Sequence, residues 1–469
     1  MLDMFNTYIG TYTLLILLVP AGITFTFLLR FPQLTKLRHA VDIVRGSFDN
    51  PNDPGDINHF QALSAALSAT VGTGNIAGVA LAIYYGGPGA VFWLWVTGFF
   101  GMALKFAECT LAQRYRVVHS DGSVSGGPMY YIERGAKSVL GRFAKPAALF
   151  FAGGGILCSI GTGNMSQSNS MADAIHQFEI PLAGGIHIPH AAAGTVLALS
   201  VFSVVVGGIK RIGQVAARLV PFMAGLYILG ALAVVIGNAS EIPRMFQMIL
   251  EGAFTGTAAT GGFVGATFLL TMRYGVARGI FSNEAGQGSA PIAHAAAKTE
   301  QPVREGLVAL LEPLIDTLLI CTLTAAVILT TGEWRSGRMG AAMSYHAFEA
   351  GLNISIGDVS VGGTIVSLGL LLFAFSTAVS WSYYGDRCVE YLFGKKAIVP
   401  YRYVYCIFIF IGAIWSQELV WKFVDAAIVL MAVPNLIALF ILAPEVKEMT
   451  NRYFSDPTNL TPPGAAMSR

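Results

Sequence analysis

Residues 68–75 read SATVGTGN and interrupt an apolar segment that begins near Phe60. Two glycines flanking a threonine, followed by an asparagine, are unfavourable in the interior of a helix. Unwound backbone at membrane depth is tolerated only where it lines a cavity, because lipid offers no hydrogen bonds. There, freed N–H groups can bind a carboxylate and freed carbonyls can bind a cation. Close helix packing explains the glycines alone equally well, but Thr70, Thr73 and Asn75 favour a binding site.

The composition places this segment in a membrane. The 469 residues are 54% hydrophobic and only 12% charged, whereas soluble domains carry about a quarter charged residues. So little charge cannot cover the surface of a water-soluble protein of this size, which indicates an integral membrane protein bound by lipid. The net charge of +2 argues against nucleic acid as a partner. The five cysteines form no CxxC pair, so neither a disulfide framework nor a zinc site is expected.

Eleven apolar segments are long enough to span a membrane as helices. The first runs from Tyr8 to Leu29, and no basic residue precedes it, so we expect a retained helix and not a signal peptide. The other ten begin near Phe60, Pro88, Pro146, Ala191, Gln214, Ile242, Gly306, Gly362, Tyr401 and Glu418. We expect an N-terminal helix and cytoplasmic connector (1–59), a five-helix repeat (60–240), a second, inverted five-helix repeat (241–445) and a cytoplasmic tail (446–469).

The distribution of basic residues predicts the orientation. With the N-terminus outside, all but four of the 29 Lys and Arg residues fall in inner loops or at the inner end. The four exceptions are Arg244, Arg335, Arg338 and Lys422. Because basic residues concentrate in cytoplasmic loops, we expect a multi-pass protein with its N-terminus outside and its C-terminus in the cytoplasm.

A second glycine-rich stretch, TGTAATGG at residues 255–262, interrupts the segment from Ile242 to about Met272. With the first helix set aside, each interruption falls in the first helix of a five-helix half. Five is an odd number, so the two halves enter the membrane from opposite sides. Paired interruptions in two inverted halves indicate a transport site at the membrane midplane.

Two further segments carry polar groups at membrane depth. Ser376 and Thr377 place adjacent hydroxyls in an apolar segment, and uncharged oxygens suit a monovalent cation better than Mg²⁺ or Ca²⁺. The alternative is that these hydroxyls bond back to their own helix, and this role is the more frequent one when the pair is considered by itself. Residues 161–170 read GTGNMSQSNS, and Gln167 can both donate to and accept from a substrate. An interhelical hydrogen bond is an equally good account of Gln167.

Ionisable residues at membrane depth are candidates for a proton path. Lys105 and Glu108 are three residues apart near the expected cytoplasmic end of a span, which favours a snorkelling ion pair over a relay. Glu312, Asp316 and Asp425 could each carry a coupling proton. Bonding to the backbone or to arginine is the more frequent role of such groups, and the sequence does not separate the two.

Four stretches resemble hallmarks of the alanine or glycine:cation symporter family. Residues 86–101, GGPGAVFWLWVTGFFG, resemble the family signature, with Leu94 where methionine is frequent. The stretches GIFSNEAG (279–286), APIAH (290–294) and WSYYG (381–385) resemble further hallmarks. The similarity covers almost the whole chain. It implies a transporter and not an enzyme, and the residues offer neither a nucleophile–base set nor a lined pore.

The resemblance implies the fold of the bacterial leucine transporter, in which five plus five inverted helices here follow one extra N-terminal helix. It implies a sodium-coupled importer of alanine and glycine in the inner membrane of a prokaryotic cell. The sequence leaves the oligomeric state open, with a monomer among the alternatives. Proton coupling occurs in some members, so a proton-coupled small amino acid permease is the alternative function. Substrate contacts would come from Thr73, Gly74, Asn75, Gln167, Thr377 and Trp381, with Trp381 limiting side-chain size.

Two sodium sites follow from the same resemblance. One would use the Thr70 carbonyl and the Asn75 side chain, together with Thr255. The other would lie among carbonyls and hydroxyls that belong to Ser68, Val71, Phe373, Ser376 and Thr377. One methylene in an apolar pocket is worth only about 1–3 kcal/mol, so alanine and glycine should both be accepted. A pocket that reads mainly the carboxylate and ammonium groups would also tolerate D-alanine.

Overall fold

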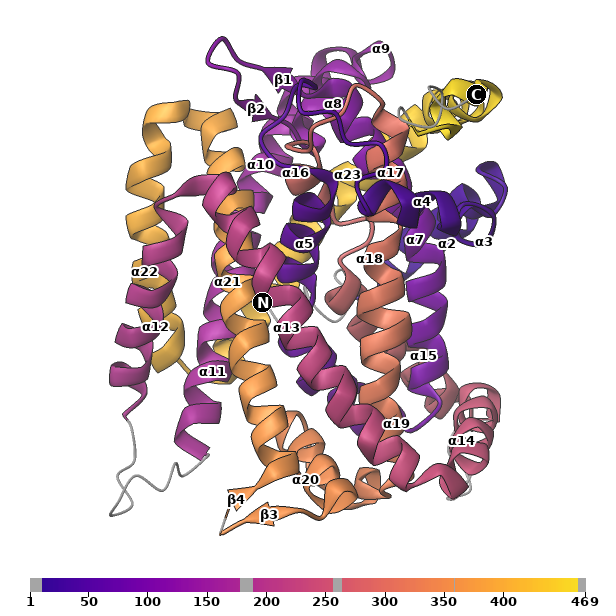
Figure 1. Ribbon diagram of the computed structural model, residues 1–469, viewed down its shortest axis with the longest axis vertical. Helices are drawn as coiled ribbons and strands as arrows, with labels where there is room; N and C mark the ends of the chain where they lie inside the picture. Colours follow the sequence, from indigo (N-terminus) through magenta and orange to yellow (C-terminus); the bar gives the residue numbers. More distant parts are fainter. Residues whose placement is uncertain (1–10, 178–188, 256–263, 358, 463–469) are drawn as a thin grey trace.

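The computed structural model describes residues 11–177, 189–255, 264–357 and 359–462 and is almost entirely helical (Figure 1). The elements up to residue 237 are α2 (Thr11–Leu28), α3 (Pro32–Thr35), α4 (Leu37–Val44), α5 (His59–Thr70), η2 (Gly74–Gly78), α6 (Val79–Gly86), α7 (Ala90–Tyr115), β1 (Val117–Val118), β2 (Val124–Ser125), α8 (Pro128–Arg134), α9 (Lys137–Leu140), η3 (Gly141–Phe143), α10 (Ala144–Ile160), η4 (Gly161–Met165), α11 (Ser166–Gln177), α12 (His190–Val205) and α13 (Gly208–Gly237).

The remaining elements follow in the same manner. They are η5 (Ala239–Glu241), α14 (Ile242–Thr255), α15 (Val264–Asn283), α16 (Ala290–His294), α17 (Pro302–Ala309), α18 (Leu311–Pro313), η6 (Leu314–Cys321), α19 (Thr322–Thr330), η7 (Glu333–Arg335), α20 (Ala341–Leu352), β3 (Ser355–Ile356), β4 (Val359–Ser360), α21 (Val361–Phe393), η8 (Lys395–Ala397), α22 (Ile398–Ile414), α23 (Gln417–Ser455) and η9 (Pro457–Leu460). The two short strand pairs, β1–β2 and β3–β4, are antiparallel hairpins in the connections between helices.

Seven helical stretches of the described chain are long and apolar enough to cross a membrane, and the bent pair α5–α6 makes an eighth if it is counted as one span. Two shorter apolar helices are Ile16–Leu28 and His190–Val205. Large apolar side chains face outward on several of these helices, for example Leu229 on α13, which is 69% exposed. An apolar outer surface is what lipid requires, so the protein is a multi-pass membrane protein.

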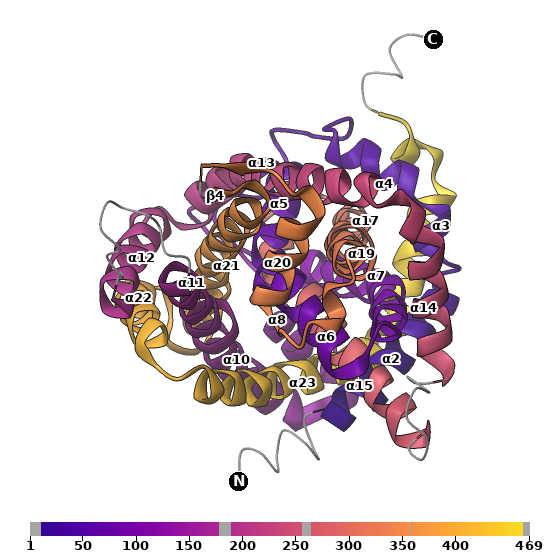
Figure 2. The same ribbon diagram turned by 90° about the horizontal axis from the view of Figure 1, so that it is seen from below.

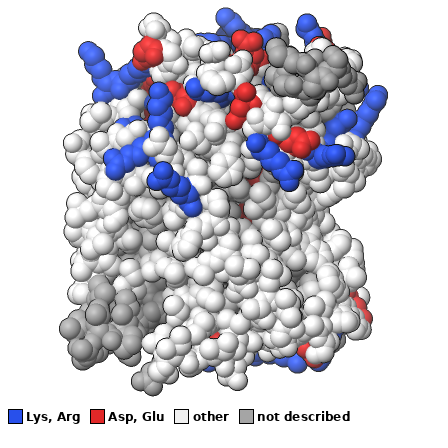
Figure 3. All heavy atoms as spheres, in the orientation of Figure 1, with Lys and Arg blue, Asp and Glu red and all other residues white. Residues whose placement is uncertain are grey.

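Charge is concentrated at one end of the molecule. On the face shown in Figure 3, Lys and Arg side chains gather at the upper end, and a broad uncharged band lies below them. In the same orientation, α4, α8 and α9 lie at that upper end, while α14, α20 and the β3–β4 hairpin lie at the opposite end (Figure 1). Two ends separated by an apolar band match the two water-facing sides of a membrane protein.

The helices form two groups when the molecule is seen from below (Figure 2). In one group α12 packs against α22 and α10 against α21 and α23; in the other α7 packs against α15 and α17. Helix α13 packs against both α5 and α21. The first interruption, between α5 and η2, therefore lies near the meeting of elements from distant parts of the chain.

The expected span from Ile242 to about Met272 is wrong in its position. Two helices of the described chain lie there, α14 (Ile242–Thr255) and α15, and residues 256–263 between them are outside the described part. Helix α15 has 20 residues and continues to Asn283. Arg273 and Arg278, which were counted with an inner loop, lie within α15 instead. Apart from Thr255 itself, the glycine-rich stretch 255–262 lies outside the described residues.

Candidate functional site

The first predicted interruption is confirmed. Helix α5 begins at a capping box formed by Asn58 and Gln61 and ends at Thr70, followed by Val71 in an extended conformation. Helical structure resumes at Gly74 as the wide π-helical turn η2, and the axis bends by 52° between the two halves. All residues from Leu67 to Asn75 are buried. The peptide groups freed here therefore face protein and not lipid, as unwound backbone in a membrane requires.

Nearby side chains hold the unwound backbone. The Gly72 N–H donates to Asn75 Oδ1 at 2.9 Å, and the Thr73 N–H points at Gln167 Oε1 at 3.4 Å. A Cβ on Gly72 would stand 2.7 Å from Thr377 Oγ1, closer than such atoms approach. A glycine is therefore required for the backbone to lie this close to α21. Gly74 begins η2 and faces Phe281 and Ser282 of α15.

Uncharged oxygens from α5 and α21 meet beside this interruption. The Ser376 hydroxyl lies within hydrogen-bond distance of two carbonyls, those of Phe373 (2.9 Å) and Ser68 (3.2 Å), and its one proton can be donated to either. The Ser68 hydroxyl donates to the Ser376 carbonyl (2.9 Å). The Thr377 hydroxyl reaches the Val71 carbonyl at 3.4 Å. All five residues are buried. We call Ser68, Val71, Phe373, Ser376 and Thr377 the oxygen cluster.

Three buried serine and threonine hydroxyls have no hydrogen-bond partner among the described residues: Thr73 Oγ1, Thr162 Oγ1 and Ser380 Oγ. Thr73 lies in the interruption, Thr162 in η4 and Ser380 one turn after Thr377 in α21. Buried polar atoms almost always have partners in folded proteins. These hydroxyls therefore fit a polar ligand that would supply the missing partners.

Gln167 and Trp381 lie on facing helices. The Gln167 amide donates to the Thr162 carbonyl at 3.1 Å, within its own helix, and its oxygen faces the Thr73 N–H. Trp381 is fully buried against Gly163, where any Cβ would overlap the indole ring. The indole N–H donates to Glu284 Oε1 at 3.0 Å. Gly163 thus sets how close η4 and α21 approach.

The chain has another interruption that the sequence patterns did not identify, between Asn283 at the end of α15 and Ala290 at the start of α16. Glu284, Gly286 and Gly288 have positive φ angles of 55°, 77° and 86°. Such angles suit glycine but cost a residue with a Cβ about 1–2 kcal/mol. The signal that could have located the break is the pair of glycines at 286 and 288 among polar residues.

Glu284 gives the GIFSNEAG hallmark a physical role. Its buried carboxylate accepts from the Trp381 indole at 3.0 Å and from the Ser289 hydroxyl at 2.5 Å. These contacts connect both ends of the second interruption to α21. The strained backbone of Glu284 is therefore held by the contacts of its own side chain.

The structure places the remaining predicted site residues in different surroundings. Thr70 is buried, and its hydroxyl bonds back to the Ala66 carbonyl at 3.2 Å. Thr255 is exposed at the end of α14, where its hydroxyl donates to the Glu251 carbonyl at 2.5 Å. The structure does not bring Thr255 to the buried oxygen cluster, because this residue is exposed at the last described position of α14. The side chain of Asp425 lies outside the described residues.

The expected snorkelling pair of Lys105 with Glu108 is also wrong. Lys105 is fully buried, and its ammonium group lies 3.0 Å from the Glu312 carboxylate, on α18. Glu108 accepts instead from the Gly286 N–H (3.3 Å) and the Asn435 amide (3.0 Å). Helix α7 is covered by other helices at this level, so these charged groups cannot reach water. They find their partners on neighbouring helices instead.

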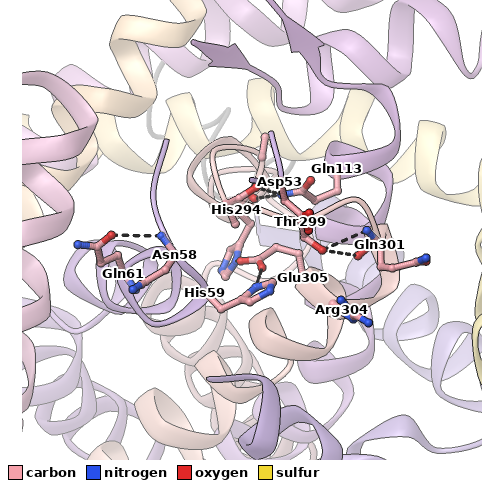
Figure 4. A network of polar contacts seen from close by, with 12 residues as sticks. Asp53, Asn58, His59, Gln61, Gln113, His294, Thr299, Gln301, Arg304 and Glu305 are labelled. Atoms are coloured by element: carbon pink, nitrogen blue, oxygen red, sulfur yellow. Dashed lines mark hydrogen bonds and ion pairs between the residues drawn. The ribbon is translucent and has the colours of Figure 1, made fainter. Parts of the chain in front are cut away.

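A chain of buried charges extends from this ion pair. One ring nitrogen of His294 lies 2.6 Å from Glu305, whose other oxygen contacts His59 (Figure 4). The second ring nitrogen of His294 lies 2.7 Å from Glu312. Carboxylate oxygens accept hydrogen bonds, so both nitrogens of His294 serve as donors when the carboxylates are ionised. This series of contacts connects five helices: α5, α7, α16, α17 and α18. We call its members, Lys105, Glu312, His294, Glu305 and His59, the buried ionic chain.

Comparison with known sequences gives a consistent result. The model of the family described as the sodium:alanine symporter family matches residues 1–463. The sodium/alanine symporter AgcS of Methanococcus maripaludis is 42% identical over 453 residues, which cover 96% of this chain and 95% of that protein. The amino-acid carrier protein AlsT of Bacillus subtilis is 36% identical over 432 residues, covering 91% of this chain and 86% of that protein.

Comparison with solved structures identifies a shared fold. MhsT in complex with L-phenylalanine has a TM-score of 0.55 at 14% identity and covers 84% of this chain and 98% of that one. A Na⁺-coupled sialic acid symporter, in a substrate-bound outward-open state, has a TM-score of 0.54 at 14% identity, covering 94% and 98%. At this identity the likeness concerns the fold alone, which is the leucine-transporter fold that the sequence resemblance implied.

Proposed function

The chain belongs to the sodium:alanine symporter family, and from that premise we propose that it imports alanine and glycine together with Na⁺ by alternating access. The observation that carries this proposal is the buried interruption after Thr70, which contacts the oxygen cluster and contains the Thr73 hydroxyl, a group with no partner among the described residues. Freed N–H groups and freed carbonyls at one place suit an amino-acid carboxylate and a cation side by side.

The substrate carboxylate would bind the N–H groups of Thr73 and Gly74, next to Asn75. The Gln167 oxygen, now 3.4 Å from the Thr73 N–H, would turn to the substrate ammonium group. Trp381, fixed by Gly163 and Glu284, would close the pocket against larger side chains. A pocket that recognises mainly the two charged groups would accept glycine, alanine and D-alanine, because one methylene changes binding by only about 1–3 kcal/mol.

One Na⁺ would bind in the oxygen cluster. Its hydroxyls and carbonyls already lie within hydrogen-bond distance of one another, so a cation could bind between these oxygens once the O–H bonds rotate away from it. Uncharged oxygens hold a monovalent ion weakly enough for release. Because the cluster joins α5 to α21, sodium there would stabilise the backbone that holds the substrate, and each ligand would raise the affinity for the other by the same factor. A second Na⁺ would bind near the Thr70 carbonyl and the Asn75 side chain, without Thr255, which is exposed on α14.

We also propose eleven spans arranged as five plus five inverted helices behind α2. The seven long apolar stretches and the bent pair α5–α6 would form eight of these spans, and α2, α12 and α15 would form the other three. The basic end seen in Figure 3 would lie in the cytoplasm of a prokaryotic cell, and the N-terminus would lie outside the inner membrane, as the distribution of basic residues along the sequence predicts. The α5–α7 and α15–α19 group would move against the group that contains α10, α21 and α22.

The energetics permit uptake against a gradient. One Na⁺ moving inward across about 100 mV supplies roughly 2.3 kcal/mol. A tenfold sodium gradient adds about 1.4 kcal/mol. The total of about 3.7 kcal/mol would sustain a roughly 500-fold gradient of a neutral amino acid.

Uptake into proteoliposomes tests the proposal. We expect purified protein to accumulate labelled alanine with Na⁺ outside, and to do so at least about tenfold more slowly with K⁺ outside, because the oxygen cluster would then lack its ion. Unlabelled glycine and D-alanine should compete. Equal rates in Na⁺ and K⁺, at matched membrane potential and with empty liposomes as the control, would contradict sodium coupling.

Gln167→Ala tests the substrate site. We expect the half-saturating alanine concentration to rise about tenfold or more, because a hydrogen bond to a charged group contributes about 1.5–3 kcal/mol. Ser170→Ala on the same helix is the matched control, since the Ser170 hydroxyl bonds only the Ser166 carbonyl of α11 among the described residues, at 2.9 Å. A wild-type half-saturating concentration in Gln167→Ala would assign this residue to helix packing.

A further inference from the structure

His59 carries the one nitrogen of the buried ionic chain that lacks a hydrogen-bond partner among the described residues. Its Nδ1 contacts Glu305, while its Nε2 is buried, and the side chain is only 1% exposed. A carboxylate oxygen accepts hydrogen bonds, so Nδ1 carries the proton and Nε2 of the neutral ring presents a lone pair. Buried polar atoms almost always have partners in folded proteins. The buried ionic chain therefore contains one nitrogen whose lone pair can accept a proton.

The charges of the buried ionic chain balance only while His59 is neutral. Lys105 and His294, which donates from both ring nitrogens, each carry a positive charge, and Glu305 and Glu312 each carry a negative one. A proton on His59 Nε2 adds a fifth charge, and no acceptor faces it among the described residues. An unpaired charge buried away from water is strongly unfavourable. A proton at His59 therefore destabilises the packed arrangement around it.

Two carboxylates, Glu305 and Asp49, lie close enough to His59 to interact with its charge. Of the buried ionic chain, His294 and Glu312 lie beyond Glu305 as seen from His59. Helix α5 also packs against α4, α13 and α21. Charged groups on these elements and on α17 have partners of their own: His39 with Tyr453, Lys210 with Asp56, Asp386 with Arg402, and Arg304 with the Phe48 ring. Asp49 is exposed in the connector before α5, so it offers a proton a route from water to His59.

His59 lies where the start of α5 is joined to the segment around α16. The N–H groups of Asp56 and Ile57 donate to the Ala296 carbonyl at 2.8 and 3.2 Å, and the Lys298 N–H donates to the Ile57 carbonyl at 2.8 Å. We call this contact of residues 56–59 with residues 294–298 the α5–α16 contact. It lies about 17 Å along α5 from the first interruption, in the upper part of Figure 1, where α16 and α17 lie. A substrate released toward the basic end would need this contact to open.

The buried ionic chain does not extend to the first interruption. It ends at the pair of Lys105 and Glu312. Asp316, one turn after Glu312, accepts instead from three neutral groups outside the chain, those of Asn75 (2.6 Å), Ser282 (2.8 Å) and Thr317 (2.7 Å). A proton taken up at His59 is therefore retained at the α5–α16 contact and is not passed to the predicted substrate site.

We propose that His59 is a proton-binding site through which the pH at the basic end controls the opening of the α5–α16 contact. This inference rests on the proposed function, to which it adds a regulatory ligand. Opening would bring His59 into water, where its charged form is stable, so the proton binds the open arrangement more tightly than the closed one. By linkage, acid then shifts the population toward the open arrangement. Histidine changes its charge between about pH 5 and 8, within the range a cell can reach.

Thiol modification of an Ala62→Cys protein tests this site. Ala62 is fully buried on α5 and packs against Ala296 and Ala297, so a thiol there reacts with N-ethylmaleimide only when the contact opens. His59→Asn keeps an N–H donor near the position of Nδ1 but cannot take up the proton. At pH 6 we expect the introduced thiol to react about tenfold more slowly with His59→Asn than without it, and at pH 8 equally fast, since one proton shifts an equilibrium by at most about tenfold per pH unit. Comparison at one pH removes the direct effect of pH on the thiol.

His346→Asn in the same Ala62→Cys protein is the matched control. His346 also contacts a glutamate through Nδ1, that of Glu349 at 2.8 Å, but it is partly exposed on α20 at the opposite end. This variant should retain the faster reaction at pH 6. Mass spectrometry of the peptides separates the introduced thiol from the five native cysteines.

The outcomes separate this inference from the proposed function. Equal reaction rates with and without His59→Asn at both pH values would overturn the proton site, while sodium-dependent alanine uptake by the wild type would still support the proposed function. Wild-type uptake that is driven by a pH gradient without Na⁺ and is lost in His59→Asn would show that the proton travels with the substrate, which also overturns it. If His59→Asn does not fold, the Ala62→Cys protein decides alone: a rate that, divided by the rate for free cysteine, is the same at pH 6 and pH 8 overturns the inference.

Discussion

Replacing Lys105 with methionine is expected to lower the free energy of unfolding by about 3–5 kcal/mol, because it leaves a buried carboxylate without its main partner. Lys105 and Glu312 are both fully buried, with their charged atoms 3.0 Å apart. Methionine replaces most of the apolar stem, so the loss reports the charge and not a cavity. The measurement is the fraction of purified protein that remains monodisperse in detergent after heating across a range of temperatures.

Lys145→Met is the matched control. Lys145 also lies 3.0 Å from a carboxylate, that of Glu133, but its side chain is 52% exposed. Exposed ion pairs contribute only about 0–1 kcal/mol. The double variant Lys105→Met/Glu312→Gln should regain part of the lost stability, since no unpaired charge remains on Glu312. A midpoint shift in Lys105→Met no larger than that in Lys145→Met would show that the buried ionic chain does not stabilise the fold.

The variant Ser376→Ala/Thr377→Ala is expected to raise the sodium concentration for half-maximal alanine uptake by about 100-fold or more. Each hydroxyl would contribute a contact to a charged ligand, worth about 1.5–3 kcal/mol, and every 1.4 kcal/mol is a factor of ten. Thr377→Ala alone should give a smaller shift in the same direction. The measurement is a Na⁺ titration of initial uptake rates in proteoliposomes.

Ser382→Ala controls for the loss of a buried hydroxyl from the same helix. Its hydroxyl donates to the Val379 carbonyl of α21 at 2.6 Å. We expect a wild-type sodium dependence in this variant. If the Ser376→Ala/Thr377→Ala protein folds and shows an unchanged half-activating sodium concentration, the oxygen cluster is not a sodium site, and its hydroxyls serve only to bond helices.

Sequence reasoning succeeded at the first interruption because its cause is local. Glycine at 72 and 74 disfavours the helix whatever the surrounding structure, and polar neighbours at membrane depth need partners. Ser376 and Ser68, which are 308 residues apart, were predicted to belong to one sodium site, and in the structure they are hydrogen-bonded to each other. That grouping came from resemblance to a family and not from the spacing of the residues.

The second interruption was misplaced for a physical reason. Residues 255–262 and 283–289 both contain glycines among polar residues, and local propensity cannot decide which of two such stretches lies at membrane depth. The decision depends on which helix is long enough to span and which is covered by others. Helix α15 packs along α7 and ends at Asn283, and residues 283–289 are all buried. The buried partners of Glu284 and Asp316 likewise became visible only after the helices were placed together.

The amino-acid sequence by itself determined the class of this protein. A charge content of 12% excludes a water-soluble surface, and the long hallmark stretches identify the family. Tertiary structure alone decided the partners of the ionisable groups. Lys105 has an acidic residue three positions away on its own helix, yet it pairs with Glu312, 207 residues distant. Helix periodicity sets which side chains share a face, but inside a membrane protein a charge must find its partner wherever packing excludes both water and lipid, and packing depends on the whole chain.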